Sequence, residues 1–198
     1  MAAIRKSLIV IVSAPSGSGK TTIVSRLLER MDGIKRCITC TTRKPREGEK
    51  DKEEYIFLSG EEFSKMRDNG EFLEWEENFG NFYGTPEKQF NDAMETGTDI
   101  ILSIDVKGAR EVKNIFPESV SVFVMPPSTE ELETRLRKRN TDGEKAVSLR
   151  LQESQREIAA ADEYDYLIMN EKVEEAVEEL KCIIESERKK LRQYSAKG

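Results

Sequence analysis

The segment that most constrains this chain is a glycine-rich loop between a buried strand and a helix. Ser7 to Ser13 is a near-continuous apolar run, which predicts a strand buried on both faces. The loop Ala14-Pro-Ser-Gly-Ser-Gly-Lys-Thr21 follows at once, and residues 20–31 then carry apolar side chains at helical spacing. This order predicts a fold in which a buried parallel strand leads through a tight loop into the N-terminus of a helix.

The loop has the chemistry of a phosphate cradle and matches the Walker A spacing, with alanine at its first position. Gly17 and Gly19 let the backbone N–H groups point inward, and the helix N-terminus adds partial positive charge. Lys20 reaches the β- and γ-phosphates, and Thr21 offers a hydroxyl directly to Mg²⁺. The alternative is a Gly/Ser-rich turn with an incidental lysine. We therefore expect a nucleoside triphosphate to contact Ala14, Pro15, Ser16, Gly17, Ser18, Gly19, Lys20, Thr21 and Thr22.

The rest of the chain alternates strand and helix patterns, which predicts an α/β fold with a parallel sheet flanked by helices. Further buried strands are expected at 99–106, 120–125 and 166–169, and a final helix at 172–192. Capping-box spacing predicts helix starts at Ser59 and Ser128. A polar segment (41–54) and an aromatic one (55–84) interrupt the alternation and indicate a small, antiparallel inserted lobe.

Composition excludes several classes of protein. The 198 residues fit one domain, and with no histidine the chain cannot use Ser-His-Asp or Cys-His catalysis. A net charge of −6 argues against a nucleic-acid binder. There is no apolar run of the ~20 residues that a membrane span needs, and no secretory signal, so we expect a cytoplasmic protein. Cys37-Ile-Thr-Cys40 lacks a second cysteine pair and is interpreted as two ordinary reduced thiols.

A second chemical signal lies at Thr39-Cys-Thr-Thr-Arg-Lys-Pro-Arg46. Arg43 and Arg46 flank a stiffening proline, which places two bidentate guanidinium groups close together. Such a pair suits a dianionic monophosphate, to which Tyr55 and Tyr83 could add phenolic donors. Taken alone, the arginine pair is equally explained by an exposed basic loop.

The ordered motifs resemble those of guanylate kinases: A-P-S-G-S-G-K-T, T-C-T-T-R-K-P-R-E-G-E, E-F-L-E-W, G-N-F-Y-G-T, I-D-V-K-G and R-N-T-D. The resemblance runs from Leu8 to about Leu180. It implies transfer of the γ-phosphate of Mg-ATP to GMP, giving ADP and GDP in purine nucleotide metabolism. It also implies a single domain with a core (1–35, 86–129 and 159–198), a GMP-binding lobe of mixed α/β structure (36–85) and a helical lid (130–158).

The same resemblance implies roles for individual residues. Arg43, Arg46, Tyr55 and Tyr83 would hold the GMP phosphate, and Thr39, Glu74 and Thr85 the guanine. The Glu74 carboxylate can accept from guanine N1 and N2, whereas adenine presents a lone pair at N1. The alternative for Glu74 is a surface carboxylate in an acidic run.

The resemblance implies two further acceptor-site residues near the end of the expected strand 99–106. Ser103 stands where the family usually has an acidic residue that holds the guanine amine, and its hydroxyl can still accept a hydrogen bond. Asp105 would lie near the GMP ribose and serve Mg²⁺ through water; its alternative role is a helix cap.

The segment 135–156 is rich in arginine and is expected to be helical. By resemblance, Arg135, Arg139 and Arg150 would bridge the donor and acceptor phosphates as catalytic residues when the lid closes. The alternative is a solvated helix with pairs four residues apart, which we expect for Arg137. Asn140 stands where the family more often has glycine, and Asn170 is expected near the adenine.

Three other functions compete with this hypothesis. A related kinase could phosphorylate another acceptor, such as ribose 1,5-bisphosphate, which would leave Thr39 and Glu74 unexplained. A scaffold module of the same fold would bind phosphopeptides, but such modules degrade the phosphate loop. A GTPase is disfavoured because the chain has no Asn-Lys-x-Asp stretch. The expected partners are ATP and GMP, without nucleic acid, membrane or obligate protein partner, in a monomer or homodimer.

Overall fold

The computed structural model describes residues 4–46, 48–138, 144–190 and 194–195. Its centre is a five-stranded parallel sheet in the order β10-β9-β2-β8-β3. The strands are β2 (Ile9–Ser13), β3 (Ile34–Cys37), β8 (Asp99–Ser103), β9 (Val120–Met125) and β10 (Tyr166–Met169). All residues of β2 are buried, as its apolar run predicts.

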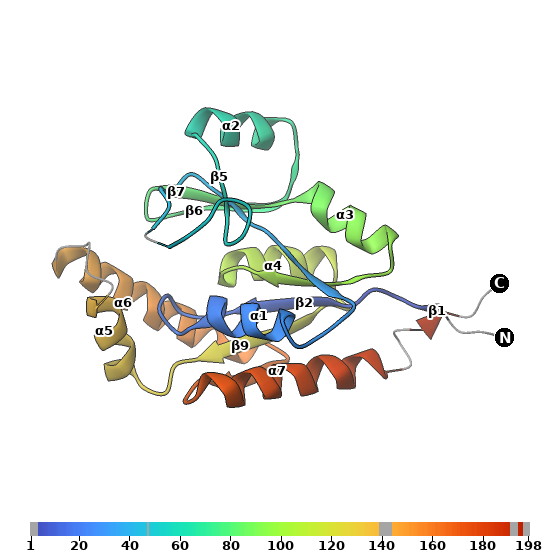
Figure 1. The fold of residues 1–198 in the computed structure, drawn as a ribbon. Coiled ribbons are helices and arrows are strands. Elements are labelled where there is room, and N and C mark those ends of the chain that lie inside the picture. Colours follow the sequence, from blue (N-terminus) through green and yellow to red (C-terminus); the bar gives the residue numbers. More distant parts are fainter. Residues whose placement is uncertain (1–3, 47, 139–143, 191–193, 196–198) are drawn as a thin grey trace.

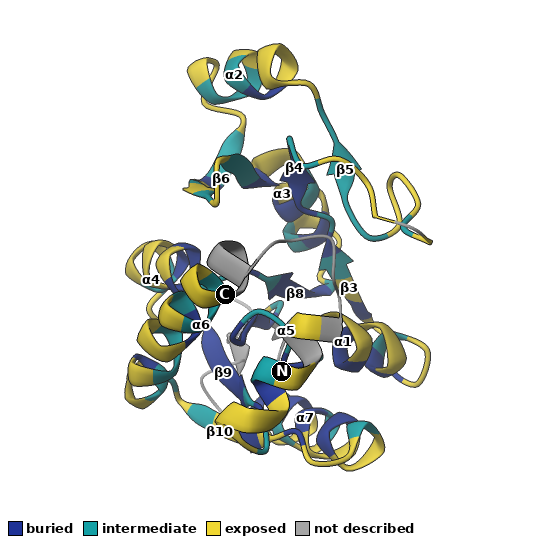
Figure 2. Ribbon diagram, turned by 90° about the vertical axis from the view of Figure 1, so that its left-hand side faces the viewer, coloured by how far each residue is buried: buried dark blue, intermediate teal, exposed yellow. Residues whose placement is uncertain are grey.

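Helices cover both faces of this sheet (Figure 1). They are α1 (Lys20–Leu28), α3 (Glu87–Glu95), α4 (Val106–Ile115) and α7 (Val173–Arg188). Side chains alternate along β2, so that Val10 and Val12 pack with α1 and α7 while Ile9 and Ile11 pack with α3 and α4. The result is a three-layer α/β core, whose buried residues line the sheet and the inner helix faces (Figure 2).

A second, four-stranded sheet lies beside this core, in the order β5-β4-β7-β6. We call residues 40–86 the small lobe. It comprises β4 (Cys40–Thr41), β5 (Ile56–Phe57), α2 (Gly60–Asp68), β6 (Phe72–Asn78) and β7 (Asn81–Pro86). The expectation of an antiparallel sheet is correct for β4-β7 and β6-β7 but wrong for β4 and β5, which pair parallel. Both bonds of the predicted capping box at Ser59 and Glu62 are present.

Two helices, α5 (Thr129–Lys138) and α6 (Glu144–Ala159), project from the core after β9 (Figure 1). A 3₁₀ turn (Ala161–Glu163) returns the chain to β10. The strands β1 (Ile4–Arg5) and β11 (Tyr194–Ser195) pair antiparallel away from the main sheet. Within the described ranges, no helix combines the length and hydrophobicity needed to cross a membrane.

The cysteine interpretation agrees with the structure. Cys37 ends β3 and Cys40 begins β4, and both are buried free thiols. Burial raises the pKa of each of these two thiols to about 12, which keeps them protonated and unreactive at neutral pH.

Candidate active site

The phosphate loop connects the carboxyl end of β2 to the first turn of α1. Gly17 and Gly19 have φ values of 96° and 94°, in the left-handed region that glycine tolerates best. The N–H of Ser18 donates to the carbonyl of Pro15 at 3.1 Å, which closes the turn. Gly19 is the N-cap of α1 and supplies no side-chain acceptor to the first helical N–H groups. These donors therefore suit an anionic ligand.

Lys20 lies at the base of the cleft, between the ends of β2 and β8. Its Nζ donates to the carbonyl of Ile104 at 2.6 Å. Burial lowers the pKa of the Lys20 ammonium from 10.5 to about 8, against the opposing effects of Asp105 and Glu157. The site is thus built to receive further negative charge, because bound phosphates would favour the protonated amine.

Asp105 performs the capping role considered for it, since its Oδ1 accepts from the N–H groups of Lys107 and Gly108 at 3.0 Å each. The side chain also lines the cleft. Burial is the main cause that raises the pKa of its carboxyl, with Lys20 acting in the opposite direction. Capping and ligand contact are compatible here, because both cap bonds use the same oxygen.

A buried polar group lies at the small-lobe end of the cleft. Glu74 of β6 is 4% exposed and accepts a hydrogen bond from the hydroxyl of Thr85. Burial raises the pKa of the Glu74 carboxyl to about 7. The alternative of a surface carboxylate is therefore wrong. Thr39 lines the same cleft, and its hydroxyl has no hydrogen-bond partner within the described part of the chain.

The predicted phosphate ligands also gather on this side. Arg43 lies 5.2 Å from the ring centroid of Tyr55, which in turn packs edge-on against Tyr83 at 6.2 Å. Arg43 donates to both carboxylate oxygens of Glu49, and the backbone N–H of Arg46 donates to one of them. Glu49 therefore holds the Arg43 guanidinium and the backbone of Arg46, while the side chain of Arg46 lies on the exposed part of the loop.

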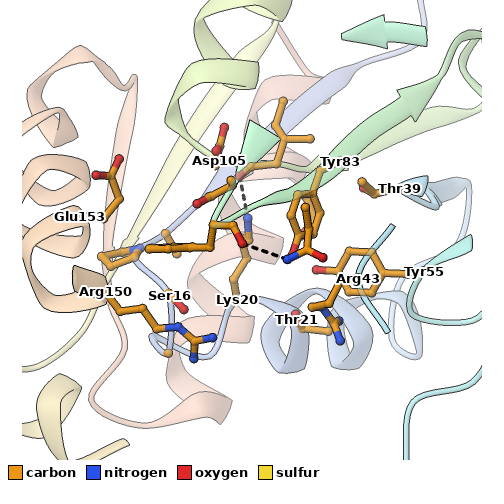
Figure 3. A pocket seen from close by; sticks show the side chains of 18 of the residues that line it. Ser16, Lys20, Thr21, Thr39, Arg43, Tyr55, Tyr83, Asp105, Arg150 and Glu153 are labelled. Atoms are coloured by element: carbon orange, nitrogen blue, oxygen red, sulfur yellow. Dashed lines mark hydrogen bonds between the residues drawn. The ribbon is translucent and has the colours of Figure 1, made fainter. Parts of the chain in front are cut away.

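One cleft of about 1170 Å³ joins these groups to the phosphate loop. Figure 3 shows Lys20 and Asp105 at its centre, with Arg43, Tyr55 and Tyr83 on one side and Arg150 and Glu153 on the other. Most of the predicted site residues line it: Ala14, Pro15, Ser16, Gly17, Gly19, Lys20, Thr21, Thr22, Thr39, Arg43, Arg46, Tyr55, Glu74, Tyr83, Ser103, Asp105 and Arg150.

Three predicted residues lie just behind this lining: Ser18, Thr85 and Asn170, all nearly or fully buried. Asn170 donates its side-chain amide to the carbonyl of Ser18 at 2.6 Å and so holds the phosphate loop. Its Oδ1 has no partner within the described ranges, so the expected contact with adenine stays a prediction.

The arginine-rich helices are described only in part. The side chain of Arg135 and the whole of Arg139 and Asn140 lie outside the described residues, so their expected roles stay predictions. Arg137 pairs with Glu133 on the exposed face of α5, as its solvated interpretation predicts. Arg150 lines the cleft from α6.

Sequence reasoning missed three contributors to the site. Glu49 is the last residue of the motif T-C-T-T-R-K-P-R-E-G-E, but its pairing with Arg43 depends on how the loop folds. Glu157 lines the cleft and has a pKa raised by burial to about 7 while facing Lys20. Glu157 lies seven residues after Arg150, and this spacing on a helix indicates that both side chains lie on the same face, toward the cleft. Phe79, at the tip of the β6-β7 hairpin, also lines the cleft.

The fold and this cleft define a P-loop protein, with the phosphate loop and a second group of polar side chains in one cavity. Residues 6–187 match the family model described as guanylate kinase, and the chain belongs to that family. It is 47% identical over 185 residues to a guanylate kinase of Carboxydothermus hydrogenoformans, covering 93% of this chain and 91% of the relative.

Other relatives give the same result. A guanylate kinase of Clostridioides difficile is 43% identical over 191 residues, covering 96% of this chain and 93% of the relative. The crystal structure of guanylate kinase from Anaplasma phagocytophilum superposes with a TM-score of 0.82 at 35% identity, covering 98% of this chain and 93% of that one. The predicted family and fold class are thereby confirmed.

Proposed function

We propose that this guanylate kinase moves the γ-phosphate of ATP, held on the phosphate loop, to GMP held by the small lobe, giving ADP and GDP. The observation that carries the acceptor assignment is Glu74. This buried carboxylate lies in the same cleft as the phosphate loop and is joined to Thr85. A buried carboxylate needs donors, and guanine supplies two on its N1 and N2 edge.

Adenine fits this site poorly, because its N1 would present a lone pair to the carboxylate. A site built around buried hydrogen-bonding groups can discriminate by about 10⁴-fold against a ligand that leaves them unpaired. The hydroxyl of Thr39, which has no partner among the described residues, supports the same assignment, as does the presence of Ser103 in the cleft lining.

The phosphate ends of the two nucleotides meet near Lys20. Arg43, Arg46, Tyr55 and Tyr83 hold the GMP phosphate, whose oxygen attacks the γ-phosphorus in line while the bond to the β-γ bridging oxygen breaks. Negative charge builds on the transferring oxygens, and fixed cations stabilise it. We assign this role to Lys20, Arg135, Arg139 and Arg150, with α5 and α6 acting as a lid that excludes water.

The donor set also fits Mg²⁺, which prefers oxygen ligands. The hydroxyl of Thr21 and the carboxylate of Asp105 both line the cleft beside Lys20. The Oδ2 atom of Asp105 is outside the helix cap. We therefore assign Thr21 as a direct ligand and Asp105 as a ligand through water. When bound, Mg²⁺ would neutralise part of the triphosphate charge.

An ADP-release assay with Mg-ATP and a panel of acceptors tests this function. The panel contains GMP, dGMP, AMP, UMP, CMP and ribose 1,5-bisphosphate. We expect turnover with GMP and dGMP, and none above background with the other nucleotides. Turnover with the sugar phosphate alone would show a different acceptor, and ATP binding without any turnover would favour a scaffold role.

A further inference from the structure

The tip of the β6-β7 hairpin has a residue that its local structure does not explain. Asn78 and Asn81 pair across the hairpin, so Phe79 and Gly80 form a two-residue turn with φ values of 50° and 71°. Such turns favour Asn-Gly, because the first position is left-handed and a bulky side chain is strained there. Nevertheless the position holds phenylalanine, and the residue is 48% exposed.

The aromatic core of the small lobe does not account for Phe79 either. Phe63 stacks on Phe72 at 4.5 Å and on Phe82 at 5.4 Å, and these rings hold α2 against the sheet. Phe79 projects from the hairpin tip and lines the nucleotide cleft.

Across the cleft, the Phe79 ring meets an arginine of the proposed lid. The Cζ atom of Arg150 lies 5.8 Å from the ring centroid, within the range of a cation–π interaction. Leu149, the neighbour of Arg150 on α6, is also exposed and lines the same cleft. A side chain of the β6-β7 hairpin thus lies against a side chain of α6.

We propose that Phe79 is a positioning residue, whose ring receives the guanidinium of Arg150 across the cleft and holds it in place for phosphoryl transfer. The inference rests on the proposed role of Arg150. A long arginine side chain loses much rotamer freedom when it is fixed, and a preformed contact lowers that cost in the reacting complex.

The position of Phe79 also links the two substrate sites. The same hairpin carries Glu74 on β6 and Tyr83 on β7, so its tip moves with the residues proposed to hold GMP. The contact with Arg150 therefore connects the hairpin that carries these residues to α6.

Three substitutions of Phe79 distinguish the effect of its aromatic ring from the effect of its backbone conformation in the turn. Phe79→Asn keeps a residue suited to the left-handed conformation but removes the ring. Phe79→Leu keeps apolar bulk without a π face, and Phe79→Trp keeps the π face. A cation–π contact of this kind corresponds to about two- to fivefold in rate. We expect kcat to fall by about fivefold in Phe79→Asn and Phe79→Leu, with KM for GMP and Tm unchanged, and to return to within about twofold of wild type in Phe79→Trp.

A double-mutant cycle with Arg150→Ala completes the test. If Phe79 acts through Arg150, Phe79→Asn lowers kcat in the wild-type background and has no further effect in Arg150→Ala. Trp75 offers a matched control, because it lies on β6 of the same hairpin and receives the guanidinium of Arg67 at 5.3 Å without lining the cleft. Trp75→Leu should leave kcat unchanged.

Normal kcat in Phe79→Asn, or equal losses in the Asn and Trp variants, would overturn the proposal. Additive losses in the cycle would do so as well. If Arg150→Ala keeps wild-type kcat, the proposed role of Arg150 fails and the inference fails with it. If Arg150→Ala is impaired and Phe79→Asn is not, only the inference about Phe79 fails.

Discussion

The guanidinium of Arg43 is held by the carboxylate of Glu49 through two hydrogen bonds of 2.9 Å each. Both side chains are largely shielded from solvent, and the same carboxylate accepts the backbone N–H of Arg46 at 2.8 Å. Glu49 thereby fixes the loop that carries both arginines proposed to hold the GMP phosphate. A fixed bidentate arginine binds a phosphate with less loss of side-chain entropy.

Glu49→Gln should therefore weaken GMP binding. We expect KM for GMP to rise about tenfold, equivalent to roughly 1.4 kcal/mol, with kcat and KM for ATP little changed. Steady-state kinetics in each substrate measures this. Glu53→Gln is the control, since Glu53 pairs with Lys50 on the exposed side of the same segment. Unchanged KM for GMP in Glu49→Gln would refute the ordering role.

Glu74 should make acceptor use dependent on pH. Burial raises the pKa of its carboxyl to about 7 in the empty site, and only the ionised form accepts from both guanine donors. We expect kcat/KM for GMP to fall as the pH drops below about 7, because this parameter reports the free enzyme. In Glu74→Gln the parameter should be lower throughout and this acid limb should be absent. An acid limb that persists in Glu74→Gln would assign it to another group.

Ionisation of the Glu74 carboxyl should also make the folding stability of the protein depend on pH. Because the pKa of Glu74 in the fold is above its ordinary value of 4.5, its contribution to stability is present below pH 4.5 and is lost as the pH rises through about 7. Glu74→Gln should therefore stabilise the nucleotide-free protein above pH 7, on the order of 3 kcal/mol. Thermal unfolding at pH 5 and pH 8 measures the difference; a Tm lowered at pH 8 would contradict it.

Gly108 on α4 sets the position of Glu74. A Cβ atom on Gly108 would lie 2.6 Å from Oε2 of Glu74, so Gly108→Ala must displace that carboxylate. Alanine is also the better helix former by about 1 kcal/mol, so the fold should tolerate the change. We expect KM for GMP to rise at least about fivefold while KM for ATP and Tm stay close to wild type. Equal effects on both substrates would show general damage instead.

Lys20→Met should separate catalysis from folding. The ammonium contributes to transition-state charge stabilisation, so kcat should fall by about a thousandfold. Burial lowers the pKa of Lys20 to about 8, so at pH 7 the lysine is still charged in the fold and this buried charge costs stability. The variant should therefore unfold at an equal or higher temperature at pH 7. Near-normal kcat in a folded variant would remove Lys20 from the mechanism.

Asp99 and Arg188 join the last helix to the core sheet. Asp99 is fully buried, and its carboxylate accepts from the N–H of Leu8 and from Nε of Arg188, each at 2.7 Å. Arg188→Leu removes a cationic partner of a buried charge, which should cost about 3 kcal/mol of unfolding free energy. Denaturant unfolding measures this, with Lys172→Ala as the control in an exposed pair. A loss below about 1 kcal/mol would show that this pair contributes little.

The local sequence predicted those elements whose hydrophobic pattern and turn residues specify them without contacts to distant segments. The apolar run ending at Ser13, the glycines of the loop and the spacing after Lys20 specify β2, the phosphate loop and α1 without distant contacts. The strand expected at 99–106 ends earlier, at Ser103, because Asp105 caps the following helix. Ile34–Cys37 was not predicted as a core strand, since a short segment with two charged residues becomes one only by pairing with β8.

The sequence by itself determined the alternating elements, the phosphate loop and, through family motifs, which residues we propose to bind GMP. Tertiary structure decided the strand order β10-β9-β2-β8-β3, the bond from Lys20 to Ile104 and the contact of Arg150 with Phe79. The physical reason is the separation along the sequence over which each kind of interaction acts. Periodicity and turn chemistry act within a few residues, whereas these contacts join segments many residues apart that meet only when both faces of the sheet are packed.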